Sequence, residues 1–150
     1  LCRGYMEKDE FFLKVSRALS GCQMIEMELK LYLSNAVALI NKRLGNRMFC
    51  GMSGDDFQNH SLERLITEFK KFSDNGTLIK RLNKFKDERN FLSHKAIASC
   101  MDPHNGYQGL QAASLDERLL KIEKEASDIT HTIHEESAKF LGYLLFEDEV

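Results

Sequence analysis

The amino-acid sequence predicts an all-α protein, an antiparallel bundle of four to five helices of which two are long. Apolar residues recur at alternating steps of three and four along extended stretches, which is the spacing of one helix face and not the alternation of a strand. The 150 residues include only nine glycines and one proline, so the turns that a β-sandwich needs are scarce. A chain of this length fits one domain over residues 1–150, which buries roughly 70% of its unfolded surface on folding.

The first long helix is expected over residues 5–44, where the apolar stripe is longest. Ser20 and Gly21 either divide this helix or only bend it. A loop rich in glycine, serine and aspartate follows over 44–60, and a second helix over 61–72. The stripe of the first helix consists of Phe12, Val15, Leu19, Cys22, Ile25, Leu29, Tyr32, Ala36 and Leu39.

The turn at 73–76 provides an N-cap for a third helix, expected over 77–98. Its apolar seam passes through position 89, which an arginine occupies. A second loop follows over 101–109 and contains the only proline, Pro103.

A long terminal helix is expected to begin after this loop. Ser114 and Glu117 have the spacing of a capping box, which marks the start of a helix. The apolar stripe that follows is interrupted once, at Glu136.

The net charge of −2, from 21 basic and 23 acidic residues, hides an uneven distribution. Residues 70–95 hold eight basic and three acidic side chains, a local charge of +5, whereas residues 114–150 carry −6. The two segments are either ordinary solvated faces or a local phosphate-attracting patch beside an acidic remainder. The overall balance excludes a protein that coats nucleic acid indiscriminately, because such binding depends on broad phosphate neutralisation.

The four cysteines, Cys2, Cys22, Cys50 and Cys100, are scattered, and we expect reduced thiols in a soluble, cytoplasmic protein. No run approaches eighteen apolar residues, so no membrane partner is expected. The glycine-rich motifs of nucleotide and dinucleotide loops do not occur, and no cofactor is predicted.

Two histidines on the terminal helix raise the question of a metal site. His131 and His134 stand three residues apart, with Asp128 three residues before His131. Di-iron bundles need E-x-x-H on two helices and two further glutamates, whereas this chain has one loose D-x-x-H. A polar helix face is therefore expected there, and no metal.

The third helix carries the candidate site residues Arg89, Asn90 and His94. At about 100° per residue, Asn90 and His94 lie on one helix face, one turn apart. Arg89 occupies a position of the apolar seam, where a charge is costly unless it is paired or faces a groove. The alternative is an arginine whose stem packs while its guanidinium reaches solvent.

These side chains suit the cleavage of RNA by its own 2′-hydroxyl. Arginine stabilises the charge that builds on a phosphate, histidine transfers a proton near neutral pH, and asparagine orients the reacting groups. The reaction needs both a base and an acid, whereas each chain supplies only one histidine in this motif, beside one arginine. A symmetric homodimer that brings two copies together is therefore expected.

The sequence R-N-x-x-x-H near the end of a helix resembles the motif of the HEPN superfamily, in which an arginine and usually a polar residue precede a histidine. The run from Gln23 to Tyr32, with Glu26 and an L-K-x-Y continuation, resembles the first long helix of many HEPN proteins. The resemblance assigns Arg89 and His94 to the catalytic pair and Asn90 to the polar position. It assigns Glu26 to the helical acid, with Glu28 as a second choice.

The resemblance implies a dimeric helical bundle with metal-independent endoribonuclease activity that leaves a 2′,3′-cyclic phosphate. Many members are toxins of toxin–antitoxin or phage-defence systems, so an antitoxin or regulatory protein is a further expected partner. One subclass carries a tyrosine, modified by its antitoxin, two residues after the histidine. Ala96 stands at that position here, so the resemblance does not extend to that regulation.

Two other functions fit the same sequence. The first is a non-catalytic helical module that binds a partner protein, a nucleotide or RNA. The second is a helical regulator that recognises DNA, for which the turn at 73–76 before a basic helix is only a loose match.

Overall fold

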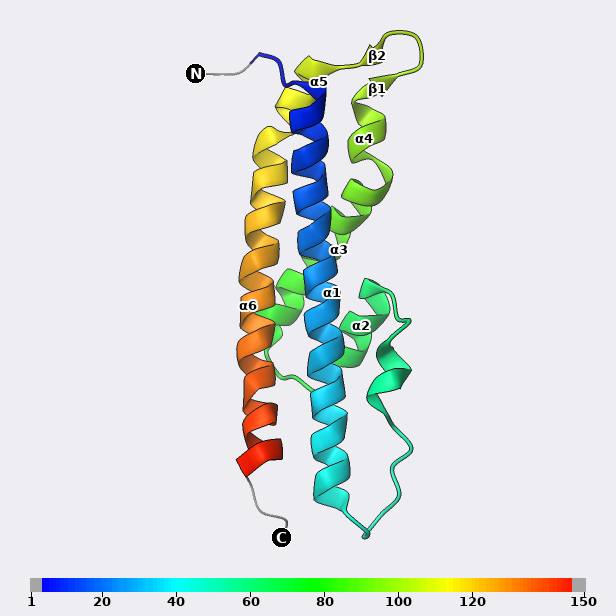
Figure 1. The fold of residues 1–150 in the computed structure, drawn as a ribbon, viewed down its shortest axis with the longest axis vertical. Helices are drawn as coiled ribbons and strands as arrows, with labels where there is room; N and C mark the ends of the chain where they lie inside the picture. Colours follow the sequence, from blue (N-terminus) through cyan, green and yellow to red (C-terminus); the bar gives the residue numbers. More distant parts are fainter. Residues whose placement is uncertain (1–3, 147–150) are drawn as a thin grey trace. The chain divides into compact units, whose positions relative to one another are not determined.

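The chain folds almost entirely into helix in a computed structural model, which describes residues 4–146 (Figure 1). These residues are 76% helical and form six α-helices, with one two-stranded antiparallel hairpin as their only sheet. The all-α bundle predicted from the sequence is confirmed. Within the described range, no helix has both the length and the apolar character needed to cross a membrane.

Two long helices, α1 and α6, lie at the beginning and the end of the described chain, as the apolar stripes predicted. The shorter elements lie between them. In chain order the elements are α1 (Lys8–Leu44), the 3-10 helix η1 (Gly54–Phe57), α2 (Leu62–Phe69), α3 (Gly76–His94), α4 (Ala96–Ser99), β1 (Met101–Asp102), β2 (Gly106–Tyr107), α5 (Gly109–Ser114) and α6 (Asp116–Phe146).

Helix α1 continues without a break through Ser20 and Gly21. A Cβ atom added at Gly21 would lie 2.7 Å from the Cβ of Ala126 on α6. Real Cβ atoms do not approach this closely, so Gly21 lets the two helices pack against each other at short range. The glycine therefore serves packing and does not end the helix.

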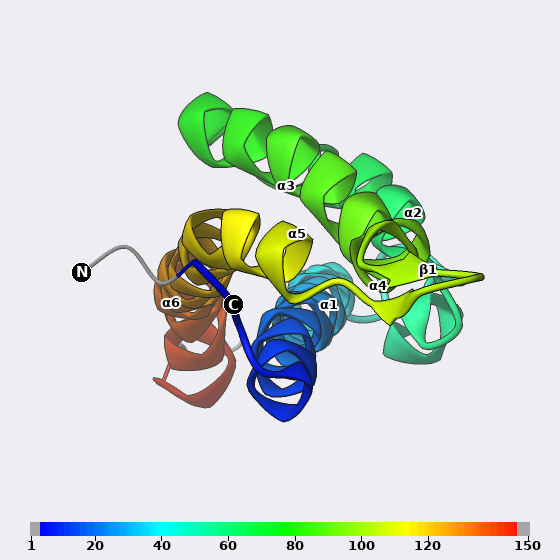
Figure 2. The same ribbon diagram turned by 90° about the horizontal axis from the view of Figure 1, so that it is seen from above.

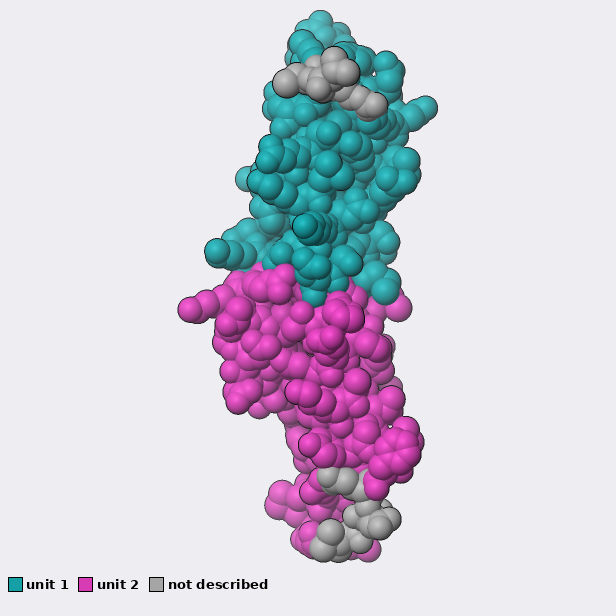
Figure 3. Space-filling view, turned by 90° about the vertical axis from the view of Figure 1, so that its left-hand side faces the viewer, with its two compact units in different colours: residues 1–24, 84–128 teal, residues 25–83, 129–150 magenta. Residues whose placement is uncertain are grey.

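Contacts divide the chain into two compact units, which Figure 3 shows in different colours. Unit 1 consists of residues 1–24 and 84–128, and unit 2 consists of residues 25–83 and 129–150. Parts of α1, α3 and α6 belong to each unit.

One end of unit 1 is formed by α5, which lies beside the beginnings of α1 and α6, and by the β1–β2 hairpin, which follows α4 (Figures 1 and 2). The backbone N–H of Met6 donates to the carbonyl of Gly109 at 3.0 Å, and the hydroxyl of Tyr107 donates to the carbonyl of Met6 at 2.6 Å. The ring of Tyr5 packs directly on Gly109, where an added Cβ would lie 2.1 Å from the ring and would force it to move. These contacts fix the segment before α1 against the chain that follows α3.

The segment 101–109, predicted as a loop, is ordered by this hairpin. The Asp102 carboxylate accepts hydrogen bonds from the backbone N–H groups of His104 and Asn105, which lowers the pKa of Asp102. Gly106 has φ +72°, a backbone conformation that favours glycine. The hairpin therefore has a turn set by local polar chemistry.

The capping box predicted at Ser114 is wrong. Ser114 is the last residue of α5, and its hydroxyl donates to the carbonyl of Gln111 one turn earlier. The terminal helix begins two residues later, at Asp116. The hydroxyl cannot cap the terminal helix because it is bonded within α5, a short helix that the sequence pattern did not predict.

The core of unit 2 is built around aromatic rings. Tyr32 on α1 packs against Phe69 on α2 and Phe140 on α6, with ring centroids 4.7 and 4.9 Å apart. Nearby, the amide of Asn35 donates to the buried hydroxyl of Ser137 at 3.1 Å. These two polar side chains are thus paired inside the unit.

The interruption of the α6 stripe at Glu136 has a structural reason in unit 2. Its carboxylate accepts hydrogen bonds from the hydroxyl of Ser73 at 3.2 Å and from the amide of Asn75 at 2.7 Å. Asn75 in turn accepts a hydrogen bond from the backbone N–H of Leu78 in the first turn of α3. Glu136 therefore ties α6 to the cap of α3, and a polar residue replaces an apolar one at this step.

The two long helices run parallel to each other. Lys14 pairs with Asp116 in unit 1, and in unit 2 Asn35 pairs with Ser137 and Lys42 with the carbonyl of Leu144, each time 102 positions apart. A constant separation of this kind requires the same direction in both helices. Helix α3 runs the opposite way (Figure 1). The antiparallel relation predicted for the bundle thus holds between α3 and the long helices, and not between α1 and α6.

Candidate functional site

The candidate residues lie at the end of α3, whose apolar seam the sequence predicted correctly. Leu82, Phe85 and Leu92 on this seam are each at most 2% exposed. Arg89 occupies the same seam and is half-buried. Its stem therefore lies among apolar positions of α3 in unit 1, as its spacing predicted.

Asn90 and His94 lie on the solvent-exposed side of α3, one helical turn apart. His94 is the last residue of the helix. The next residue, Lys95, has φ −125° and ψ −31°, and a separate short helix begins at Ala96. The third helix therefore ends four residues earlier than predicted, and the break leaves the imidazole at an exposed helix end.

Ala96 shows why a tyrosine would not fit two residues after the histidine. It is fully buried at the start of α4. A phenol at this position would have to displace core atoms of unit 1.

The two glutamates considered upstream lie in unit 2, whereas Arg89, Asn90 and His94 lie in unit 1. Glu26 is half-buried on α1. The Glu28 carboxylate lies 3.3 Å from Nδ1 of His134, so it is paired with α6. The structure thus places the arginine, asparagine and histidine at one helix end, and both glutamates belong to the other unit.

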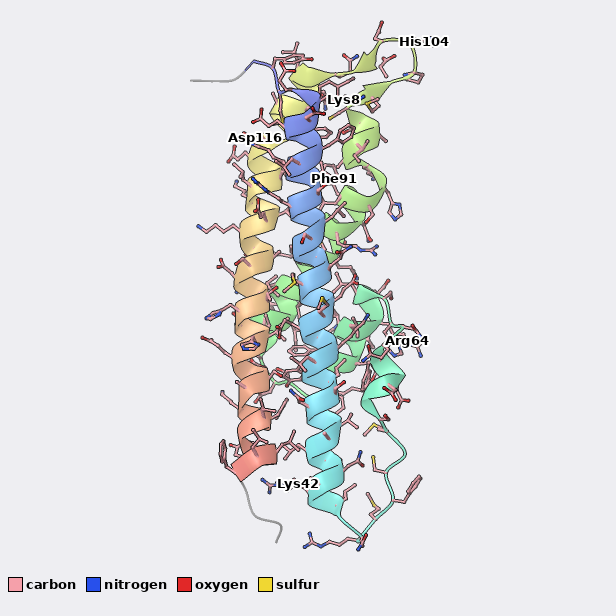
Figure 4. All side chains as sticks on the ribbon, in the orientation of Figure 1. Lys8, Lys42, Arg64, Phe91, His104 and Asp116 are labelled. Carbon is pink, nitrogen blue, oxygen red and sulfur yellow. The ribbon has the colours of Figure 1, made fainter. Side chains whose placement is uncertain are left out.

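A cluster that sequence reasoning missed lies next to this helix end. The guanidinium of Arg118 on α6 donates to the carboxylate of Glu88 through Nε at 3.0 Å and Nη2 at 2.9 Å. Its Cζ atom lies 3.5 Å from the ring centroid of Phe91, which is labelled in Figure 4. The hydrogen bond to Glu88 is the main cause that raises the pKa of Arg118. Glu88 and Arg118 are 30 positions apart, so no local pattern could have indicated this contact.

The charges on this part of α3 are predominantly basic. In unit 1 the helix carries Lys84, Lys86 and Arg89 against Asp87 and Glu88. Because Arg118 neutralises Glu88, this part of the helix keeps an excess of basic over acidic side chains.

The other histidines do not gather into a site. His131 lies 3.0 Å from the carboxylate of Glu135, and His134 pairs with Glu28 as described. His104 lies at the turn of the hairpin (Figure 4). Across residues 4–146, no three histidine, cysteine, aspartate or glutamate side chains come together as a metal site would require. Cys22, Cys50 and Cys100 form no disulfide, and Cys2 lies outside the described residues.

The end of α3 therefore presents an imidazole and a carboxamide to solvent beside a half-buried guanidinium, in basic surroundings. Such a set can bind a phosphate and move a proton. No protein-family model, curated protein or solved structure matches this chain.

Proposed function

We propose that the protein is a metal-independent endoribonuclease of the HEPN type, which cleaves RNA at a site formed by two chains of a homodimer. The observation that carries this proposal is the exposure of His94 and Asn90, one turn apart at the end of α3. The half-buried Arg89 one position before Asn90 supports it. Toxins of toxin–antitoxin and phage-defence systems would be functional parallels, with an antitoxin as partner.

In the proposed reaction the 2′-oxygen of a ribose attacks the adjacent phosphorus. The bond between phosphorus and the 5′-oxygen of the next nucleotide breaks, and a 2′,3′-cyclic phosphate remains. The 2′-hydroxyl proton passes to one histidine acting as base, and the leaving 5′-oxygen takes a proton from another acting as acid. Arg89 stabilises the charge on the phosphate, and Asn90 orients the attacking hydroxyl.

Each chain supplies one His94, so the base and the acid come from two copies. Glu26 would act as a positioning residue, as the family resemblance implies. In a homodimer with both motifs at the symmetry axis, one phosphate would meet two guanidinium groups.

Cleavage of RNA in the presence of EDTA tests the proposal. The wild-type protein is expected to produce fragments that end in a 2′,3′-cyclic phosphate. His94→Ala is expected to cut roughly 100-fold more slowly or worse, because it removes proton transfer. His104→Ala, which removes an exposed imidazole at the hairpin turn, is the matched control and should cut like wild type. If the wild-type protein cuts no faster than His94→Ala, the enzymatic proposal fails.

A second candidate function is a non-catalytic module that binds a partner protein. In the loop that follows α1, in unit 2, Phe49 is 91% exposed and Met48 is 63% exposed. Neighbouring exposed apolar side chains of this size are typical of protein interaction sites. This candidate predicts equal, negligible cleavage by the wild type and His94→Ala, together with a complex that Phe49→Ser weakens.

A further inference from the structure

The side chains of Arg118, Phe91 and Glu88 form a layered cluster in unit 1, which we call the arginine stack. Cζ of Arg118 lies 3.5 Å from the Phe91 ring centroid, the separation of two planar groups in contact. Glu88 holds the guanidinium at its edge through two hydrogen bonds of 2.9 and 3.0 Å. One face and one edge of the guanidinium are therefore covered.

The remaining surface of Arg118 is open. Its side chain is 43% exposed although the ring and the carboxylate cover part of it. Among the described residues, no ring or hydrogen-bonding group contacts the face of the guanidinium that points away from Phe91. Because Glu88 neutralises the charge, this face is poorly suited to bind a phosphate. It remains a fixed plane, and guanidinium planes stack on nucleobases.

The arginine stack lies beside the candidate catalytic residues. Phe91 and His94 are three positions apart on α3, so they are neighbours on the helix surface. Glu88 directly precedes Arg89. A base held on Arg118 would therefore belong to a nucleotide next to the phosphate that reaches His94.

We propose that the exposed face of Arg118 is a stacking platform for an unpaired RNA base, so that the protein binds single-stranded RNA beside His94. This inference rests on the proposed function for its ligand, and it adds the substrate class and the residue that selects it. In a duplex both faces of a base are covered by its neighbours, so the platform favours a base in a loop or a single strand. Stacking tolerates any base, so little sequence preference is expected at this position.

Arg118→Lys is the sharpest variant, because lysine keeps the charge and can still pair with Glu88 but lacks the plane. The probe is a single-stranded 2′-O-methyl RNA, which cannot be cleaved through its 2′-oxygen, with one 2-aminopurine. Arg118→Lys is expected to bind it roughly 5- to 100-fold more weakly, the effect of losing one stacked base. The slope of affinity against salt should not change, because the number of charges is the same. Arg17→Lys, at an exposed arginine of the same unit, is the matched control and should bind like wild type.

Each result decides the inference. Equal binding by Arg118→Lys and Arg17→Lys, or the absence of binding by wild type, overturns it. If Arg118→Lys does not fold, the wild-type complex decides. A rise in 2-aminopurine fluorescence on binding, because the base leaves its stacked neighbours for a guanidinium that does not quench it, supports the platform, and unchanged fluorescence overturns it. Binding that depends on Arg118 without cleavage of ordinary RNA would leave the platform standing and remove the catalytic proposal. If wild type and Arg118→Lys both cleave RNA with the same KM, the catalytic proposal stands and the stacking platform is overturned.

Discussion

At the scale of single residues, Tyr32 shows what burial does to a polar side chain in this protein. It is 2% exposed, and its hydroxyl donates to the carbonyl of Phe72 at 3.3 Å. Burial, followed by the charge of Glu136, raises the pKa of Tyr32 from 10.0 to about 12. The folded chain therefore keeps this proton at pH values where the unfolded chain has lost it.

Tyr32 is expected to make the protein less stable at high pH. A raised pKa in the folded state contributes stability that is fully present below pH 10 and is lost as the pH rises to about 12, a change of roughly 2–3 kcal/mol. Tyr32→Phe removes this dependence and loses about 1 kcal/mol at neutral pH with its hydrogen bond. Urea unfolding of both proteins at neutral pH and at several pH values between 9 and 12 measures the difference. Stability curves that stay parallel would show that the tyrosine titrates alike in both states.

The residues of the candidate site differ in how far the sequence could predict them. Spacing alone placed Arg89 on the apolar seam and Asn90 and His94 together on another face of the helix. The structure adds that this second face is exposed. Arg118 reaches Glu88 only because α3 and α6 pack together. Contacts of this kind depend on tertiary structure, and no local pattern predicts them.

At the scale of elements, the hydrophobic period predicted which segments are helical better than it predicted which residues of a helix are buried and where the helix ends. The stripe of α1 was predicted to include Phe12, whereas Phe11 is the fully buried ring and Phe12 is half-buried. Two adjacent phenylalanines fit the period almost equally, so only packing decides between them. Helices α4 and α5, of four and six residues, are too short to show a period. The same limit explains why the end of α3 at His94 was missed.

The close contact between α1 and α6 makes a prediction about glycine substitutions. Gly21→Ala gains about 1 kcal/mol of helix propensity, but its Cβ would overlap Ala126 at 2.7 Å, which costs more. We expect a net loss of about 1 kcal/mol in the free energy of unfolding. Gly142→Ala in α6 is the matched control: it has no neighbour within 4 Å and should stabilise by about 0.5–1 kcal/mol.

The double variant Gly21→Ala with Ala126→Gly separates overlap from other effects. It moves the methyl group from one helix to the other, so most of the loss caused by Gly21→Ala should be recovered, apart from the propensity cost at position 126. Denaturant unfolding of the four proteins completes the cycle. Additive effects of the two substitutions would mean that they do not compete for the same space.

At the scale of the whole molecule, charge and site chemistry together shape how RNA would be bound. The net charge of −2 limits general attraction to nucleic acid, while the last part of α3 in unit 1 stays basic. If the protein binds RNA as proposed, this distribution would hold phosphate locally, and planar groups would supply the rest of the affinity. In a homodimer, two copies of the α3 end would double the positive charge at one phosphate, although the surface of the protein as a whole is not basic.

The shared site makes a strong prediction about mixed dimers. If one phosphate needs a His94 from each chain, a dimer of one wild-type and one His94→Ala chain is inactive, because either the base or the acid is missing. A tenfold excess of His94→Ala chains, left to exchange subunits, should therefore lower the activity of a fixed amount of wild type roughly tenfold, since few wild-type chains still meet each other. His104→Ala chains in the same excess should cause no such loss, because their dimers keep both imidazoles. Activity that does not respond to His94→Ala would mean that each chain cleaves on its own, and the proposal of a shared site would be wrong even if cleavage itself is confirmed.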